Sequence, residues 1–174
     1  MAIRVAQVAT GNAGKLTLRQ LIDDPRFELV AVSTSNSDKV GKDAGELAGL
    51  DVTTGVVAVG SLAELIDAKP QVAVYAAMGD TRPVEATKDV RTLLEAGINV
   101  VGSAPGTLQF PWGTMPQPVI DKVEAAAQAG QASIYITGVD PGFASDLIPL
   151  ALASTCQRVE KITCYELADY ATYD

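Results

Sequence analysis

The segment IRVAQVATGNAGK, residues 3–15, decides the fold. It opens with a short β-branched run from Ile3 to Val8, which is typical of a strand buried on both faces. The sequence Ala9-Thr10-Gly11-Asn12-Ala13-Gly14 follows and approximates the pattern G-x-G-x-x-G, with alanine at the first glycine position. Leucines near helical spacing then predict a helix from Ala13 to Asp23. A strand, a glycine turn and a helix in this order predict the first unit of a doubly wound α/β sheet.

The rest of the chain repeats this alternation of strands and helices. A helix between two consecutive strands requires a crossover connection, and crossovers give parallel strands. The sequence therefore predicts a Rossmann-type α/β fold, a doubly wound parallel sheet with helices on both faces. The predicted strands are Phe27 to Ser33, Gln71 to Ala77, Ile98 to Val101 and Ala132 to Thr137, and the predicted helices are Thr81 to Ala96, closed by Gly97, and Pro118 to Ala129, closed by Gly130.

A less regular insert separates the second strand from the third. Within it, Lys39 to Ala48 are predicted as a helix, Val52 to Val59 as an extended piece, and Ser61 to Ala68 as a helix capped by its first residue. Further on, the segment Gly102 to Pro118 is rich in glycine and proline and contains Trp112. We expect it to be a long structured loop at the end of a strand, where such folds bind their ligands.

Composition and charge exclude several classes of function. The 174 residues include 13 basic and 21 acidic side chains, and the net charge of -8 disfavours nucleic acid and anionic membranes as partners. The chain has no histidine, so it has no Ser-His or Cys-His pair and lacks the commonest metal ligand. Cys156 and Cys164 have no metal-site spacing, so we predict reduced cysteines and no metal site. No signal peptide or membrane-spanning stretch is visible, and we expect a cytoplasmic protein.

The glycine turn predicts a dinucleotide site. Gly11 would let the backbone approach a pyrophosphate, and Gly14 would let helix and strand pack closely. Asn12 and Ala13, where the helix begins, would supply free N–H groups at the positive end of the helix dipole. The alternative is that the glycines only form a tight turn between strand and helix. The position of the turn, at the start of the first strand–helix–strand unit, favours the nucleotide site.

The end of the second strand bears on the choice of cofactor. About 20 residues after the glycines, an NAD site usually offers a carboxylate to the ribose hydroxyls. Here the chain has Ser33, Thr34 and Ser35, with Lys39 close by. Hydroxyl groups and a lysine suit a 2′-phosphate, so NADP(H) is predicted in preference to NAD(H). The alternative is a polar turn that accepts both cofactors.

Small residues follow three further strands. Their position predicts that they line one crevice with the glycine turn, although Asp80 is explained at least as well as a helix cap. Asp140 follows the last strand and is our candidate proton donor, with a simple Asp-Pro-Gly turn as the alternative. The predicted cofactor-binding residues of this group are Ala76, Ala77, Met78, Gly79 and Asp80 after one strand, and Ser103, Ala104 and Pro105 after the next.

Four motifs resemble the dihydrodipicolinate-reductase-like superfamily, and in particular its branch of 2,4-diaminopentanoate dehydrogenase and native amine dehydrogenases. They are Gly11-Asn12-Ala13-Gly14-Lys15, Lys39-Val40-Gly41-Lys42-Asp43-Ala44-Gly45-Glu46-Leu47, Ala77-Met78-Gly79-Asp80-Thr81-Arg82-Pro83 and Gly138-Val139-Asp140-Pro141-Gly142-Phe143. The resemblance implies an NAD(P)H-dependent oxidoreductase that transfers a hydride to or from a C=N or C=O group of a small molecule.

The resemblance also implies a domain organisation. Residues 1–160 would form the NAD(P)-binding domain, and residues 161–174, with a strand over Lys161 to Leu167, would cross into a second domain that is absent from this chain. In the family that second domain supplies most of the substrate site and the interface of a homo-oligomer. We therefore expect this chain to be a catalytically incomplete part of such an enzyme.

The sequence departs from the family at two places. Residues 166–174 lack the histidine pair and lysine of dihydrodipicolinate reductases, and residues 103–107 lack the glutamate that amine dehydrogenases use for the amine. The first departure argues against dihydrodipicolinate reductase activity. The second argues against amine deamination unless a carboxylate from elsewhere replaces the glutamate. A non-catalytic NADP(H)-binding or redox-sensing module is therefore the alternative function.

Overall fold

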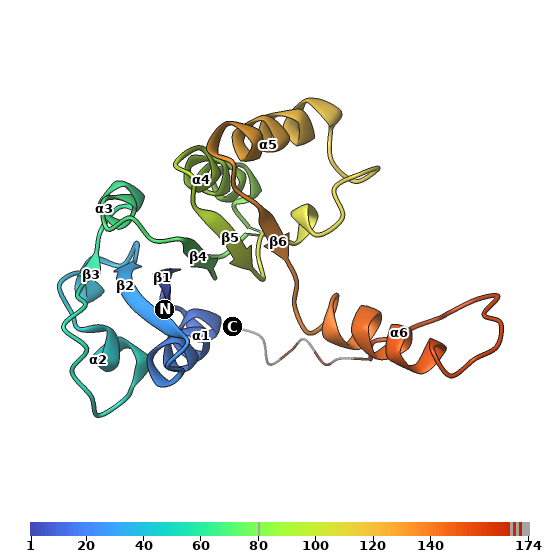
Figure 1. Ribbon diagram of the computed structural model, residues 1–174, viewed down its shortest axis with the longest axis horizontal. Coiled ribbons are helices and arrows are strands. Elements are labelled where there is room, and N and C mark those ends of the chain that lie inside the picture. Colours follow the sequence, from blue (N-terminus) through green and yellow to red (C-terminus); the bar gives the residue numbers. More distant parts are fainter. Residues whose placement is uncertain (80, 168, 170, 172–174) are drawn as a thin grey trace. The chain divides into compact units, whose positions relative to one another are not determined.

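The computed structural model describes residues 1–79, 81–167, 169 and 171, which form two compact units, Met1–Ile136 and Thr137–Asp174. The first unit contains a six-stranded parallel sheet with the strand order β3-β2-β1-β4-β5-β6 (Figure 1). The strands are β1 (Ile3–Val8), β2 (Phe27–Ser33), β3 (Ala58–Val59), β4 (Val72–Tyr75), β5 (Asn99–Gly102) and β6 (Ile134–Ile136).

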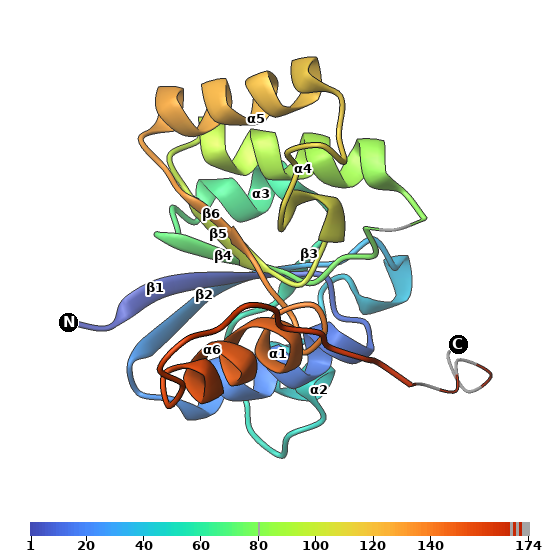
Figure 2. The same ribbon diagram turned by 90° about the vertical axis from the view of Figure 1, so that its right-hand side faces the viewer.

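Helices cover both faces of this sheet. Figure 2 shows α3 (Leu62–Asp67), α4 (Pro83–Glu95) and α5 (Gln117–Gly130) on one face, and α1 (Asn12–Asp23) and α2 (Ala44–Ala48) on the other. Each face of the sheet has its own hydrophobic core. One core includes the fully buried Tyr75, Leu65, Leu93 and Leu94, and the other includes Leu18, Val32, Ala44, Ala48 and Ala58. The parallel sheet with helices on both faces confirms the predicted Rossmann-type α/β fold.

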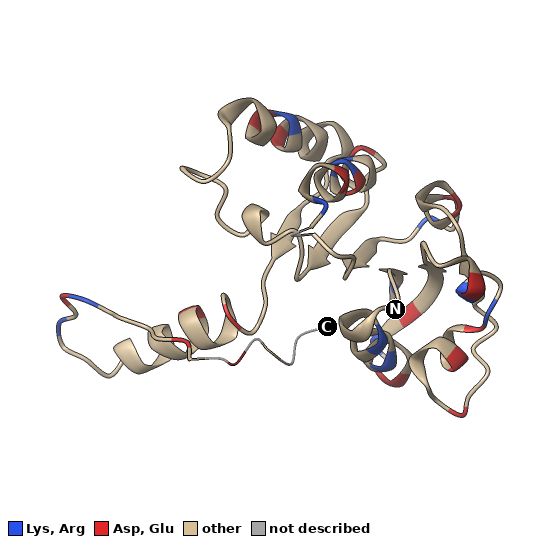
Figure 3. Ribbon diagram, turned by 180° about the vertical axis from the view of Figure 1, so that it is seen from behind, with Lys and Arg blue, Asp and Glu red and all other residues tan. Residues whose placement is uncertain are grey.

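Charged residues follow the same layering. Figure 3 shows Lys, Arg, Asp and Glu mainly on the helices and loops of the first unit, while its strands are almost free of them. A parallel sheet that is covered on both faces has no solvated face for charges, so its strands are largely apolar. This is why the strands appear in the sequence as short apolar runs without strict alternation.

The order in which strands are added to the sheet reverses at β1, because β2 and β3 lie on one side of it and β4, β5 and β6 on the other. Strand β1 pairs with β2 on one side and with β4 on the other, and Val8 lies opposite both Ser33 and Tyr75. The carboxyl ends of these three strands therefore meet at one edge of the sheet. In open α/β sheets this topological switch point is where ligands bind.

Two local predictions in the first unit were wrong. The helix predicted from Lys39 to Ala48 is a 3₁₀ turn at Ser37–Lys39 followed by the short α2. Gly41 between them has a φ of +82°, which no α-helix contains, and the Asp43 carboxylate caps α2 by accepting from the Gly45 N–H at 2.8 Å.

The second wrong prediction concerns the end of α5. Gly130 is its last helical residue, and Gln131 takes the left-handed conformation that we expected of the glycine. The reason is packing between helices, because a Cβ atom on Gly130 would collide with the carbonyl oxygen of Leu94 in α4. Gly97, in contrast, closes α4 with a φ of +77°, as predicted.

The second unit begins with a turn in which Gly138 and Gly142 form a bridge. A π-helical turn at Phe143–Leu147 leads into α6 (Ile148–Ala153). Residues 161–167, predicted as a strand, have no strand conformation. A strand needs a ladder partner, and the described residues of this unit provide none for the segment. The predicted role of residues 161–174 as a crossing into another domain stays a prediction.

Candidate nucleotide-binding site

The backbone of the glycine turn after β1 is constrained at Ala9 and Gly14 and open at Gly11. Ala9 has a φ of 71°, the left-handed conformation that glycine adopts freely and that costs alanine about 1–2 kcal/mol. A Cβ on Gly11 would meet nothing within 4 Å, so this backbone is open to a ligand. A Cβ on Gly14 would collide with the carbonyl oxygen of Ala9, so only glycine permits this approach of α1 to β1.

A buried glutamine holds the turn from inside. Gln7 of β1 is fully buried, and its Nε2 donates to the carbonyl oxygen of Ala9 at 3.0 Å. The hydroxyl of Thr17 in α1 donates to Gln7 Oε1 at 2.9 Å and lies 3.1 Å from the carbonyl oxygen of Gly14. Strand, turn and helix are thus joined by one side-chain network. Our sequence reasoning missed Gln7, whose only signal is an amide inside a buried strand.

The first turn of α1 is open to an anion. Its N-cap is Gly11, which has no side chain, so no side-chain acceptor caps the helix. Gly11, Asn12 and Ala13 are all exposed. The first N–H groups of a helix have no intrahelical acceptors, and with the helix dipole they form a ready site for phosphate. The turn therefore fits the pyrophosphate of a dinucleotide.

The end of β2 contacts the glycine turn directly. Ser33 and Thr34 are buried and Ser35 is exposed. The hydroxyls of Thr10 and Thr34 lie 3.3 Å apart, and Lys39 Nζ donates to the carbonyl oxygen of Thr10 at 2.8 Å. The structure therefore brings the predicted hydroxyl groups and the predicted lysine together beside the turn.

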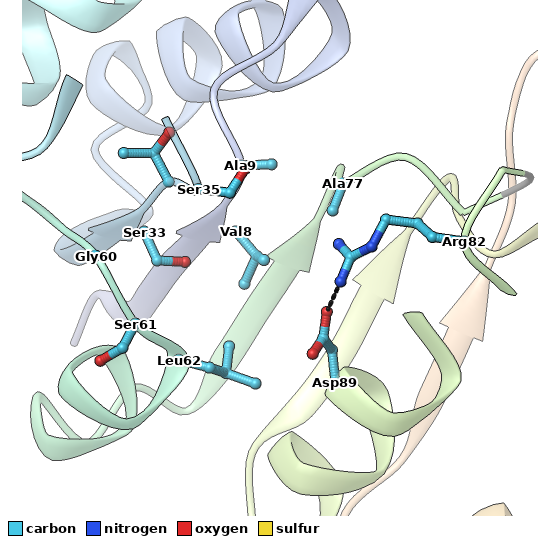
Figure 4. A pocket seen from close by; sticks show the side chains of 11 residues that line it. Val8, Ala9, Ser33, Ser35, Gly60, Ser61, Leu62, Ala77, Arg82 and Asp89 are labelled. Carbon is cyan, nitrogen blue, oxygen red and sulfur yellow. Dashed lines mark hydrogen bonds and ion pairs between the residues drawn. The ribbon is translucent and has the colours of Figure 1, made fainter. Parts of the chain in front are cut away.

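A pocket opens at this edge of the sheet (Figure 4). Three of the predicted residues, Ser33, Thr34 and Ser35, form one side, and Ala77 after β4 is also in the lining. Sequence reasoning did not predict the rest as binding residues. Ala9 and Arg82 stand in motifs quoted above, whereas the others come from separate strands, loops and helices and form no motif. The additional lining residues are Val8, Ala9, Gly60, Ser61, Leu62, Arg82 and Asp89.

The segments after β4 and β5 pack against each other. The Ala76 N–H donates to the carbonyl oxygen of Val8 at 3.1 Å, which extends the β1–β4 pairing past the strand. A Cβ on Gly79 would lie 2.7 Å from Cα of the buried Pro105, so the two segments touch at this glycine. Of the other predicted residues here, Met78 and Ser103 are exposed, Ala104 is partly buried, and Asp80 lies outside the described residues.

Asp140 belongs to the second unit. Its side chain is exposed in the turn between Gly138 and Gly142, and the Phe143 N–H closes this turn on the carbonyl oxygen of Gly138 at 2.9 Å. This geometry is that of the alternative, an Asp-Pro-Gly turn. The role of Asp140 as a proton donor stays a prediction.

The described residues contain neither a candidate metal site nor a helix that could span a membrane. No three Asp, Glu or Cys side chains among them gather where they could hold a metal ion. No helix in the described part of the chain is both long enough and apolar enough to cross a bilayer.

Comparison with known proteins relates the chain to amine dehydrogenases. An amine dehydrogenase of Streptomyces virginiae is 40% identical over 165 residues, which are 95% of this chain and 46% of that protein. The structure of an amine dehydrogenase from Mycobacterium smegmatis superimposes with a TM-score of 0.76 at 26% identity, over 91% of this chain and 46% of that one. The chain thus spans about half the length of these relatives and is a homologue of the N-terminal half of an amine dehydrogenase. No family model matches the sequence.

More distant structures share the fold alone. A biliverdin reductase from Synechocystis, in complex with biliverdin and NADP+, has a TM-score of 0.58 at 19% identity over 79% of this chain and 38% of its own. GenD2 from gentamicin A biosynthesis, in complex with NAD, has a TM-score of 0.57 at 20% identity over 78% of this chain and 34% of its own. The Rossmann-type fold of the first unit is therefore shared with proteins solved with either dinucleotide.

Proposed function

We propose, from the homology with amine dehydrogenases, that this chain is the NAD(P)-binding part of an oxidoreductase that transfers a hydride to or from a C=N or C=O group of a small molecule. The observation that carries the proposal is the open N-terminus of α1 at the topological switch point. There, a Cβ on Gly11 would meet no protein atom, while Gly14 allows the close packing that such a turn needs. Solved proteins of the same fold hold NAD or NADP+.

The chain's own residues would bind and orient the cofactor. A bound nicotinamide supplies the hydride chemistry. The N–H groups of Asn12 and Ala13 would bind the pyrophosphate, and the touching segments after β4 and β5 would hold the reactive ring in place and exclude water. A proton donor is also required, and Asp140 is our candidate within this chain.

NADP(H) is the cofactor we propose, with NAD(H) as the weaker ligand. The end of β2 offers hydroxyl groups in place of the carboxylate that usually binds the ribose of NAD. Lys39 already lies against the glycine turn, with its Nζ 2.8 Å from the carbonyl oxygen of Thr10. Asp38, the carboxylate next to Lys39 in the sequence, is exposed in the 3₁₀ turn and does not line the pocket.

An amine, or the imine from which it forms, is the substrate class that the relatives favour. Residues 103–107 contain no carboxylate to hold an ammonium group, so such a group would have to come from another segment. We also propose that the protein is a homo-oligomer formed through a second domain and that it is located in the cytoplasm. Light scattering of the complete gene product tests the first of these two properties.

Parallel titrations with NADPH and NADH test the proposal. The quenching of Trp112 and the fluorescence of the reduced cofactor should both report saturable binding, with NADPH the tighter ligand. Failure of both cofactors to bind would overturn the proposed site, and tighter binding of NADH would overturn the cofactor preference. If the complete gene product binds NADPH but oxidises it with no member of a panel of imines and ketones, the non-catalytic redox-sensing function would replace the enzyme.

A further inference from the structure

The pocket at the switch point has a charged wall that the proposed function does not use. Arg82 is the residue before α4, and Asp89 lies about two turns into that helix. A guanidinium nitrogen of Arg82 lies 3.4 Å from Asp89 Oδ2, and both side chains line the pocket (Figure 4). The Arg82 side chain is 41% exposed and lines the pocket, so a ligand there could contact it.

A buried tyrosine fixes this pair. Tyr75 of β4 is fully buried, and its hydroxyl donates to Asp89 Oδ2 at 2.9 Å, the same oxygen that faces Arg82. Burial raises the pKa of the Tyr75 phenol, with the hydrogen bond to Asp89 as the second cause, so the hydroxyl stays a donor at any physiological pH. Tyr75, Asp89 and Arg82 thus form a chain of contacts from the core of the sheet to the pocket.

The charges and the apolar lining of the pocket favour a neutral ring over an anion. Arg82 and Asp89 are the charged members of the described lining and cancel each other, and a phosphate beside Arg82 would also lie beside the Asp89 carboxylate. Val8, Leu62 and Ala77 give the lining an apolar part. A planar guanidinium stacks well on aromatic faces.

We propose that Arg82 binds the adenine ring of the dinucleotide with the face of its guanidinium, and that Asp89 and Tyr75 are the positioning residues that hold it there. This inference rests on the proposed function, since it assumes a dinucleotide at the glycine turn. The adenine would enter between Arg82 and the side of the pocket formed by Ser33 and Ser35. The 2′-phosphate would then point toward Lys39, away from the Asp89 carboxylate.

Calorimetric titration of the full chain with three fragments of the cofactor tests the inference. Arg82→Gln should weaken adenosine 5′-diphosphate and adenosine 2′,5′-bisphosphate by the same factor, about 3- to 30-fold, and leave nicotinamide mononucleotide unchanged. Lys88→Gln is the matched control, because it removes the same charge from an exposed position of α4 and should change nothing. Weakening of the 2′,5′-bisphosphate alone would show that Arg82 binds the phosphate and would overturn the inference.

The positioning role of Tyr75 and Asp89 is tested by comparing the binding of the three fragments, because a residue that only supports the fold would affect all three alike. Tyr75→Phe keeps the ring in the core and removes only the hydroxyl on Asp89, so it should weaken both adenosine fragments by a smaller factor while nicotinamide mononucleotide binding stays the same. Equal loss for all three fragments would mean general damage to the fold and would overturn the positioning role. If the unmodified chain binds NADPH normally but Arg82→Gln and Arg82→Lys do too, the inference fails and the proposed function stands. If the unmodified chain binds no fragment and no NADPH, both fail.

Discussion

Replacing Ala9 by glycine should stabilise the first unit, although glycine usually destabilises proteins. Ala9 has a φ of 71°, and an alanine in the left-handed region costs about 1–2 kcal/mol. Glycine removes this cost but adds about 0.4–1 kcal/mol of conformational entropy to the unfolded chain. The difference predicts a net gain of about 0.5–1 kcal/mol in the free energy of unfolding. For a chain of this length the gain corresponds to a rise in Tm of about 1–4 °C.

Urea unfolding followed by circular dichroism measures the change, and Ala63→Gly is the matched control. Ala63 is exposed within α3, where glycine should cost about 0.5–1 kcal/mol. The two substitutions are chemically identical, so the backbone conformation alone predicts their opposite signs. If Ala9→Gly destabilises the chain as much as Ala63→Gly does, the strain that we assign to the glycine turn does not exist.

Three further predictions concern the turn, the cofactor and pH. Gly14→Ala should cost about 1–3 kcal/mol in urea unfolding, because the new methyl group has no space, and an unchanged midpoint would contradict the packing described here. Lys39→Ala should weaken NADPH about tenfold or more and NADH much less in fluorescence titrations, with Lys42→Ala as the control; equal losses would exclude a 2′-phosphate contact. The Arg26 side chain, hydrogen-bonded to Asp24, lowers the pKa of that carboxyl from 3.8 to about 2, so the pair's contribution to stability is present above pH 3.8 and is lost as the pH falls through about 2. Arg26→Gln should return the pKa of Asp24 toward 3.8 in an NMR titration, and a carboxyl that still titrates near 2 would point to another cause.

The sequence predicts the sheet and the glycine turn well because both follow from local rules. The run from Ile3 to Val8, the spacing of Gly11 and Gly14, and the crossover rule together determine the parallel strands and the place of the turn. The hydroxyl groups after β2 are equally local, since the end of a strand next to β1 must lie near the turn. The same reasoning gives Lys39 its place.

The remaining parts of the site depend on contacts that no local pattern contains. Arg82 and Asp89 reach the pocket only because β4 and α4 place them there, and their link to Tyr75 joins a strand to a helix. Gly130 shows the same limit, because its glycine is required by the close approach of Leu94 and not by its own backbone angles. Such features become visible only when elements distant in the sequence are packed together.

The bond from Lys39 to the carbonyl oxygen of Thr10 has a consequence for protein engineering. It ties the loop that we propose distinguishes NADP(H) from NAD(H) to the turn that we propose binds the pyrophosphate, which both cofactors share. A redesign that exchanges residues 33–39 to reverse the preference would therefore also release one support of the pyrophosphate site. Variants that keep a hydrogen-bond donor for Thr10 should change their preference with little loss of affinity, whereas those without one should bind both dinucleotides poorly.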